Sequence, residues 1–177
     1  MPSGKTHDAI TFLLAVPAFV GTYVLTRSLP SSAIVVAVFV FGGLMFGPDL
    51  DTVSRQYSRW SAFRFIWFPY RKFFKHRSRF SHGLIFGALI RVIYFMGVMT
   101  LLAFAAAYVF ETYTGGRLPG LMEFVNVWRA VGDVARARFG EYSLAFVFVG
   151  LWSGAASHTF TDLAGSFIKT GRIARLF

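Results

Sequence analysis

The sequence predicts an all-α protein, a polytopic membrane bundle of about four transmembrane helices with a basic and aromatic segment at the membrane interface. Of its 177 residues, 55% are hydrophobic and 22 are Phe, and the mean hydropathy is +0.56. The core of a soluble domain of this length does not require so much apolar surface. The apolar residues also fall in four long runs, and we expect residues 1–177 to form a single integral membrane domain.

The four runs cover residues 10–26, 33–46, 84–110 and 144–168. A hydrocarbon core of roughly 30 Å requires about 20 apolar helical residues, so the third and fourth runs span it and the first is adequate. The second run is short, but a turn at residues 27–32 would join it to the first as a helical hairpin. A cleaved signal peptide is the alternative for the first run. No small-x-small cleavage site follows it, so we expect a membrane anchor.

The polar segment at residues 52–81 carries eight basic side chains interleaved with aromatic ones, and the whole chain has a net charge of +10. A nucleic-acid site, in which rings stack on bases between phosphate-binding charges, would have a similar composition. We favour a lipid interface, because Trp and Tyr prefer the headgroup zone and Lys and Arg prefer anionic lipid. The segment is then a helix interrupted at Pro69. Membrane lipid is the expected partner, and no nucleic acid is expected.

The distribution of basic residues predicts the orientation in the membrane. If the runs cross alternately, twelve basic residues lie on the side of both termini and of residues 52–81, and five lie on the other side. The positive-inside rule then places the termini in the cytoplasm and the protein in the cytoplasmic (inner) membrane. The opposite loop, residues 111–141, predicts a Gly/Pro turn at 114–120 and an amphipathic helix through Phe139.

Histidines and aspartates gather at the cytoplasmic ends of the four runs. The candidate metal ligands are His7, Asp49, Asp51, His76, His82, His158 and Asp162. His158 and Asp162 are four residues apart and share one helix face. Imidazole and carboxylate suit Zn, Mn, Fe, Co or Ni, and the chain has no Cys to supply thiolate. We therefore predict one or two divalent metal ions per chain, zinc first among them.

Small residues lead up to these ligands on several helices. Gly150 and Gly154 continue the row of His158 and Asp162, and the same four-residue spacing separates Gly43 from Gly47. This pattern is typical of close packing between membrane helices. Taken singly, each histidine would be an interfacial polar group, and haem ligation by two histidines is a further alternative that the neighbouring aspartates disfavour. Residues 3–6 imitate a phosphate-binding loop but lack its first glycine and its preceding strand.

Four motifs carry a resemblance to a known family. They lie at residues 2–8 (PSGKTHD), 42–51 (GGLMFGPDLD), 70–83 (YRK followed by HRSRFSHG) and 158–162 (HTFTD). Together they resemble a family of small membrane proteins of bacteria and archaea described as uncharacterised metal-binding proteins. They are more distantly similar to YdjM-type inner-membrane metal-dependent hydrolases. The resemblance implies the seven ligands named above, with Asp8 and Arg77 close to the metal or facing a substrate.

These features predict metal-assisted hydrolysis of a lipid-like or phosphorylated substrate at the cytoplasmic face. The candidate catalytic residues are Asp8, which would accept a proton, and Arg77, which would receive an anionic headgroup. A free carboxylate of the Asp49 and Asp51 pair is the alternative proton acceptor. The alternative is a non-catalytic subunit of a larger membrane complex, in which the ion ties helix ends together. An open coordination position beside a cavity would favour the enzyme, and a fully protein-ligated ion would favour the subunit.

Overall fold

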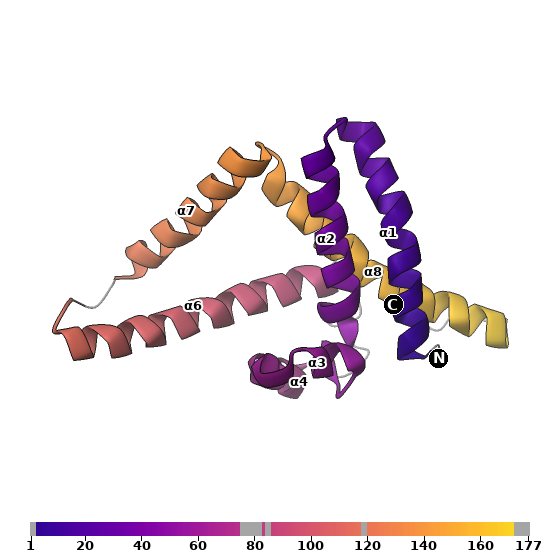
Figure 1. Cartoon of the computed structure of the whole chain (residues 1–177). Helices are drawn as coiled ribbons and strands as arrows, with labels where there is room; N and C mark the ends of the chain where they lie inside the picture. The colour runs from indigo at the N-terminus through magenta and orange to yellow at the C-terminus, as the bar shows by residue number, and fades with distance from the viewer. Residues whose placement is uncertain (1–2, 75–82, 84–85, 118–119, 172–177) are drawn as a thin grey trace.

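The structure, a computed structural model, describes residues 3–74, 83, 86–117 and 120–171, and all the regular secondary structure in these residues is helical (Figure 1). The all-α prediction is therefore confirmed for these residues. The long helices are α1 (Gly4–Thr26), α2 (Leu29–Met45), α6 (Phe86–Thr114), α7 (Leu121–Phe139) and α8 (Ser143–Thr170). The short ones, between α2 and α6, are η1 (Pro48–Asp51), α3 (Arg55–Arg59), η2 (Ser61–Trp67) and α4 (Phe68–Phe73).

Four helices are long and apolar enough to cross a membrane, and they correspond to the four predicted runs. The first two form the predicted hairpin. Arg27 ends α1 in the left-handed conformation, with φ of 51°, and Ser28 caps α2 by accepting a hydrogen bond from the Ser31 N–H. Between the last two runs, α6 ends at Thr114, where the turn was predicted to begin, and α7 is the predicted amphipathic helix.

Helices α1, α2 and α8 pack together through glycines, as the spacing predicts. A Cβ added at Gly154 would lie 2.0 Å from the Phe39 carbonyl oxygen, and one at Gly150 would lie 2.7 Å from that of Val35. On α2, a Cβ at Gly43 would meet the Thr11 side chain of α1 at 2.5 Å. The backbones therefore approach more closely than any side chain would allow, which holds the three helices in one register.

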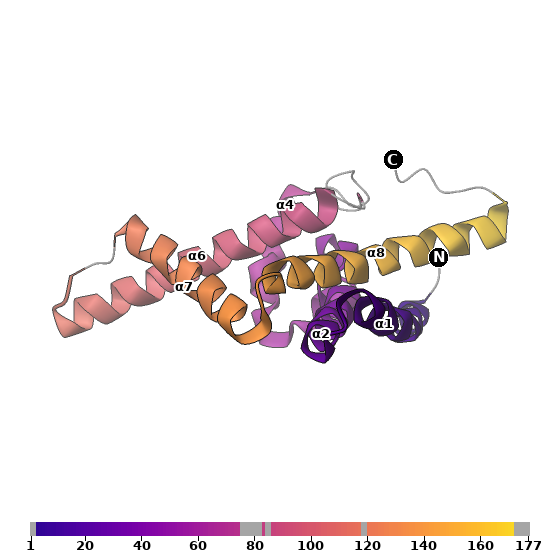
Figure 2. The same ribbon diagram turned by 90° about the horizontal axis from the view of Figure 1, so that it is seen from above.

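Helix α6 does not join this bundle, which differs from the predicted four-helix arrangement. Figures 1 and 2 show α6 running away from α1 and α2, with α7 returning toward the start of α8. Only the first turns of α6 reach the aromatic core, where Ile90, Tyr94 and Phe95 pack. Farther along, side chains such as Leu101 and Phe110 are exposed. An apolar surface on all sides of a helix selects no single face for a protein partner.

The basic and aromatic segment supplies the main hydrophobic core of the described residues, which the interface prediction did not anticipate. Trp67 and Tyr70 are fully buried against Phe46, which follows the last residue of α2, and Leu50 of η1. Residues 52–74 of the segment are broken into short helices, but Pro69 does not make the predicted break, because it lies in the first turn of α4, where its missing N–H is not needed. Other rings, including Phe63 and Phe73, remain exposed. The segment is thus an amphipathic layer beneath the end of α2.

Candidate metal centre

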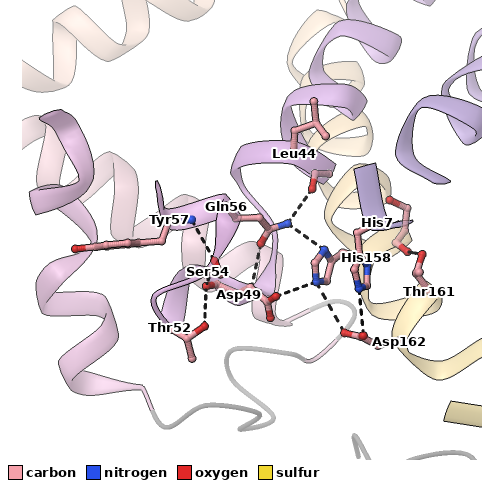
Figure 3. A network of polar contacts seen from close by, with 12 residues as sticks. His7, Leu44, Asp49, Thr52, Ser54, Gln56, Tyr57, His158, Thr161 and Asp162 are labelled. Atoms are coloured by element: carbon pink, nitrogen blue, oxygen red, sulfur yellow. Dashed lines mark hydrogen bonds and ion pairs between the residues drawn. The ribbon is translucent and has the colours of Figure 1, made fainter. Parts of the chain in front are cut away.

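Two histidines and one aspartate from the first and last helices meet inside the bundle (Figure 3). The rings of His7 and His158 are stacked, with centroids 3.8 Å apart. Asp162, one turn beyond His158 on α8, lies with Oδ1 3.3 Å from His7 Nε2 and Oδ2 3.8 Å from His158 Nε2. All three residues are buried, and one ligand atom from each lies within 4.8 Å of the others. We refer to His7, His158 and Asp162 as the ligand triad.

Local sequence explains how each member of the triad is positioned. Ser3 caps α1, so His7 falls in the first turns of that helix, and the Thr11 hydroxyl donates to the His7 carbonyl at 2.9 Å. On α8, the four-residue spacing puts His158 and Asp162 on one face. Gly154, one turn earlier on this face, lets α8 approach α2 closely.

Asp49 and Gln56 hold His158 from the side of α2. Asp49 Oδ2 lies 3.1 Å from His158 Nε2, and the Gln56 amide nitrogen lies 3.2 Å from His158 Nδ1. Gln56 is fixed in turn, because its amide donates to the Gly43 carbonyl at 2.8 Å and accepts from the Asp49 N–H at 3.2 Å. Both ring nitrogens of His158 are therefore engaged by polar groups.

The remaining predicted ligands divide into two groups. Asp51 is buried, but it does not belong to the ligand triad, and its charge acts on Tyr70 and Arg91 instead. Burial raises the pKa of Tyr70, and the neighbouring Arg91 charge opposes that rise in part. The predictions for His76, Arg77 and His82 lie outside the described residues.

Asp8 lies beside the triad but is held by two arginines of α3. Its Oδ2 atom is 2.6 Å from Arg59 Nη2 and 3.0 Å from Arg55 Nη1. The other terminal nitrogen of Arg59 donates to the Leu44 carbonyl at the end of α2, at 2.8 Å. We call Asp8, Arg55 and Arg59 the arginine clamp. The clamp therefore engages one oxygen, Oδ2, of the carboxylate that was predicted to accept a proton.

The clamp and the triad open into one pocket of about 170 Å³. Its lining includes His7 and His158 of the triad, all three clamp residues, and Asp49 with Gln56. A single water needs only roughly 10–15 Å³ of such space. The pocket therefore has room for a small anionic group next to the two imidazoles.

The donor atoms fit a divalent cation by their chemistry. Two imidazoles and a carboxylate form a donor set used by catalytic zinc sites that keep a further position open, and it also suits Mn, Fe, Co or Ni. A buried carboxylate beside two imidazole rings, such as that of Asp162, has a large desolvation cost unless positive charge compensates it. A cation shared by the three residues would supply that charge.

Sequence reasoning missed three residues of the site: Gln56, Arg55 and Arg59. All lie on α3, in a segment whose composition had indicated only an interface. The signal for Gln56 and Arg59 is their spacing with Trp60. Arg59 and Trp60 lie three and four residues after Gln56, which places the three residues on one helix face. That face meets the last carbonyls of α2, because Gln56, Arg59 and Trp60 donate to Gly43, Leu44 and Met45 respectively.

Comparison with known proteins agrees with metal binding. A family model described as "Uncharacterized metal-binding protein (DUF2227)" matches residues 2–172. An uncharacterised protein of Aquifex aeolicus (strain VF5) is 33% identical over 57 residues, which is 32% of this chain and 40% of that protein. The chain thus spans less than half the length of this relative. No solved structure matches significantly.

Proposed function

Because the chain belongs to the DUF2227 family of uncharacterised metal-binding proteins, we propose that it is a metal-dependent hydrolase of the inner membrane. Its substrate is lipid-like or phosphorylated and is bound at the cytoplasmic face. The observation that carries this proposal is the pocket of about 170 Å³ beside the ligand triad, lined by two of the three ligands. A purely structural ion would not need such a pocket. The distant similarity to YdjM-type hydrolases is part of the same proposal.

The membrane location rests on the four helices that are long and apolar enough to cross a bilayer. The triad lies near the start of α1 and close to Asp49, just after the end of α2. If α1 and α2 span the bilayer, the pocket opens at headgroup depth, where an amphiphile can present its polar end. Membrane lipid is therefore the proposed partner and source of substrate.

The triad and Asp49 have separate roles in this proposal. His7, His158 and Asp162 hold the divalent ion, for which zinc is the first candidate, with Mn, Fe, Co and Ni as alternatives. Such an ion supplies Lewis-acid polarisation of a substrate oxygen and activation of water. Asp49, 3.1 Å from His158 Nε2 and partly exposed, accepts the proton of the attacking water. This role moves from Asp8 to Asp49 because Asp8 is held in the arginine clamp. Substrate binding by Arg77 stays a prediction.

Metal content and turnover together test the proposal. Protein purified in mild detergent without chelator should contain about one or two first-row divalent ions per chain by elemental analysis. The double variant His158→Ala/Asp162→Ala should contain none, and Glu123→Ala, on distant α7, should match the wild type. Asp49→Asn should keep the metal and lose turnover of a lipid-like ester or phosphoester by roughly 10²- to 10⁴-fold, as expected for loss of a general base. Equal metal content in wild type and double variant would reject the assigned site.

A non-catalytic subunit is the second candidate, and the burial of the triad favours it. The ligands tie α1 to α8, so the ion would contribute its binding energy to folding. In that case His7→Ala should lower the melting temperature strongly, while no variant hydrolyses any ester in a panel of headgroups supplied with Zn or Mn. Hydrolysis by the wild type that Asp49→Asn abolishes would eliminate this candidate.

A further inference from the structure

The arginine clamp has an unbalanced charge. Two guanidinium groups converge on one carboxylate oxygen, Oδ2 of Asp8, at 2.6 and 3.0 Å. One negative charge faces two positive ones, so the clamp carries a net charge of one positive unit. Short contacts between guanidinium and oxyanion are among the strongest hydrogen bonds in proteins. The point at which both arginines converge is thus a place where an anionic oxygen is strongly stabilised.

The two arginines differ in how firmly they are held. Arg59 is fixed, since its second nitrogen donates to the Leu44 carbonyl and its side chain is 27% exposed. Arg55 is four residues earlier on the same face of α3, and its side chain is 52% exposed. Arg55 can therefore move toward a ligand that enters from solvent or from the membrane surface, while Arg59 keeps its position.

The clamp shares its pocket with the triad. Arg55, Arg59 and Asp8 line the same space as His7 and His158. Asp8 follows His7 directly on α1. The carboxylate that the arginines hold therefore belongs to the residue next to a ligand of the proposed ion. An anionic group held by the arginines would have its scissile bond near that ion.

We propose, building on the hydrolase function above, that the clamp is a subsite for a phosphate group and that Asp8 occupies it in the free protein. A phosphate monoester is a dianion, which matches two guanidiniums, whereas a neutral carboxylic ester offers them no charge. Arginine's planar fork also suits bidentate contact with phosphate oxygens. The substrate class is therefore a phosphate monoester, and its phosphoryl oxygens displace the Asp8 carboxylate from the arginines.

Inorganic phosphate provides a direct binding test that does not depend on turnover. The full chain, with metal content matched between samples, is titrated with phosphate by calorimetry in phosphatidylcholine nanodiscs. Asp8→Asn should bind phosphate about tenfold more tightly and Arg55→Gln about tenfold more weakly, each a change of about 1.4 kcal/mol. Asp133→Asn is the matched control, because Asp133 forms a comparable 2.6 Å pair with Arg136 on α7. It should bind like the wild type.

The variants separate the clamp from a merely structural contact. If Asp8 only ties α1 to α3, Asp8→Asn leaves phosphate affinity unchanged or weakens it, and either result overturns the proposal. Should Asp8→Asn fail to fold, Arg55→Gln still tests the proposal, because Arg55 is half exposed. Wild-type phosphate affinity in Arg55→Gln also overturns the proposal. Phosphatidic acid in the nanodiscs distinguishes the source of the group. If phosphatidic acid competes with inorganic phosphate, the bound group comes from a lipid headgroup. If it does not compete, the group comes from a soluble phosphate. Either result supports the subsite.

Failure of the subsite and failure of the hydrolase give different results. Phosphate binding that responds to Asp8→Asn and Arg55→Gln, in protein that hydrolyses nothing, supports the subsite and contradicts the hydrolase. Hydrolysis that requires Asp49, in protein whose phosphate affinity is indifferent to both clamp variants, contradicts the subsite and supports the hydrolase.

Discussion

Gln56 determines which nitrogen of His158 carries a proton. Its amide is oriented from two sides, because the oxygen accepts from the Asp49 N–H and the nitrogen donates to the Gly43 carbonyl. The same nitrogen faces His158 Nδ1 at 3.2 Å, so Nδ1 accepts and the neutral ring is protonated on Nε2, toward Asp49. A metal ligand must be unprotonated at the coordinating atom. Gln56 therefore works against ion binding at His158 Nε2.

Because the proton on Nε2 opposes coordination there, we expect Gln56→Glu to strengthen metal binding. A glutamate only accepts, so it would stabilise the proton on Nδ1, leave Nε2 available and make the ring a more basic ligand. We expect roughly tenfold tighter binding, the lower end of the changes typical of groups that orient a metal ligand. Competition with a chromophoric chelator measures the change. Equal or weaker affinity in a folded Gln56→Glu protein would contradict the assigned tautomer.

At the scale of elements, the contact between α2 and α8 depends on the absence of side chains. The Cβ of Gly154→Ala would lie 2.0 Å from the Phe39 carbonyl oxygen, so the helices must separate. Overpacking of this kind costs about 1–3 kcal/mol, and the shift of α8 should also weaken metal binding. Thermal unfolding and elemental analysis measure both effects. Gly97→Ala on α6 is the control: a Cβ there meets nothing within 4 Å, and helix propensity predicts a gain of roughly 0.5–1 kcal/mol.

The junction of α2 with α3 provides a second prediction for an element. The last carbonyls of α2 have no partner within the helix, and the Trp60 indole donates to one of them, Met45, at 2.8 Å. Trp60→Phe removes this donor and should lower the free energy of unfolding by about 1–3 kcal/mol, the cost of an unsatisfied buried acceptor. Trp128→Phe removes a similar bond to Thr100 at an exposed position and should have a much smaller effect. Equal losses would mean that the junction is not a site of particular stability.

At the scale of the whole molecule, the charge distribution predicts topology. Reporter fusions after Arg27 and after Arg117 should report the outside of the cytoplasmic membrane, and fusions after Arg64 and at the C-terminus should report the cytoplasm. The measurement bears directly on α6, whose direction differs from that of α1 and α2 in Figure 1. A cytoplasmic signal at Arg117 would show that α6 does not cross the membrane.

The sequence was sufficient for the helices, because runs of apolar residues and four-residue spacings are local signals. The spacing of His158 and Asp162 predicted a shared face, which the structure has, and it brings His7 to that face. The position of Asp51 was not predictable, since a turn of two aspartates does not indicate that the Asp51 charge acts on Tyr70 and Arg91. The burial of Trp67 depends on α6, residues far along the chain. Composition reports such rings as interfacial, because it contains no information on long-range contacts.

The composition of the ligand triad has a consequence for biogenesis. His7 belongs to α1, and His158 and Asp162 belong to α8. All the residues between these two helices must therefore be synthesised before the three ligands can meet. A nascent chain that has not yet produced α8 can offer an ion only His7 of the ligand triad. Capture of the proposed ion by all three ligands therefore requires that α8 has already been synthesised.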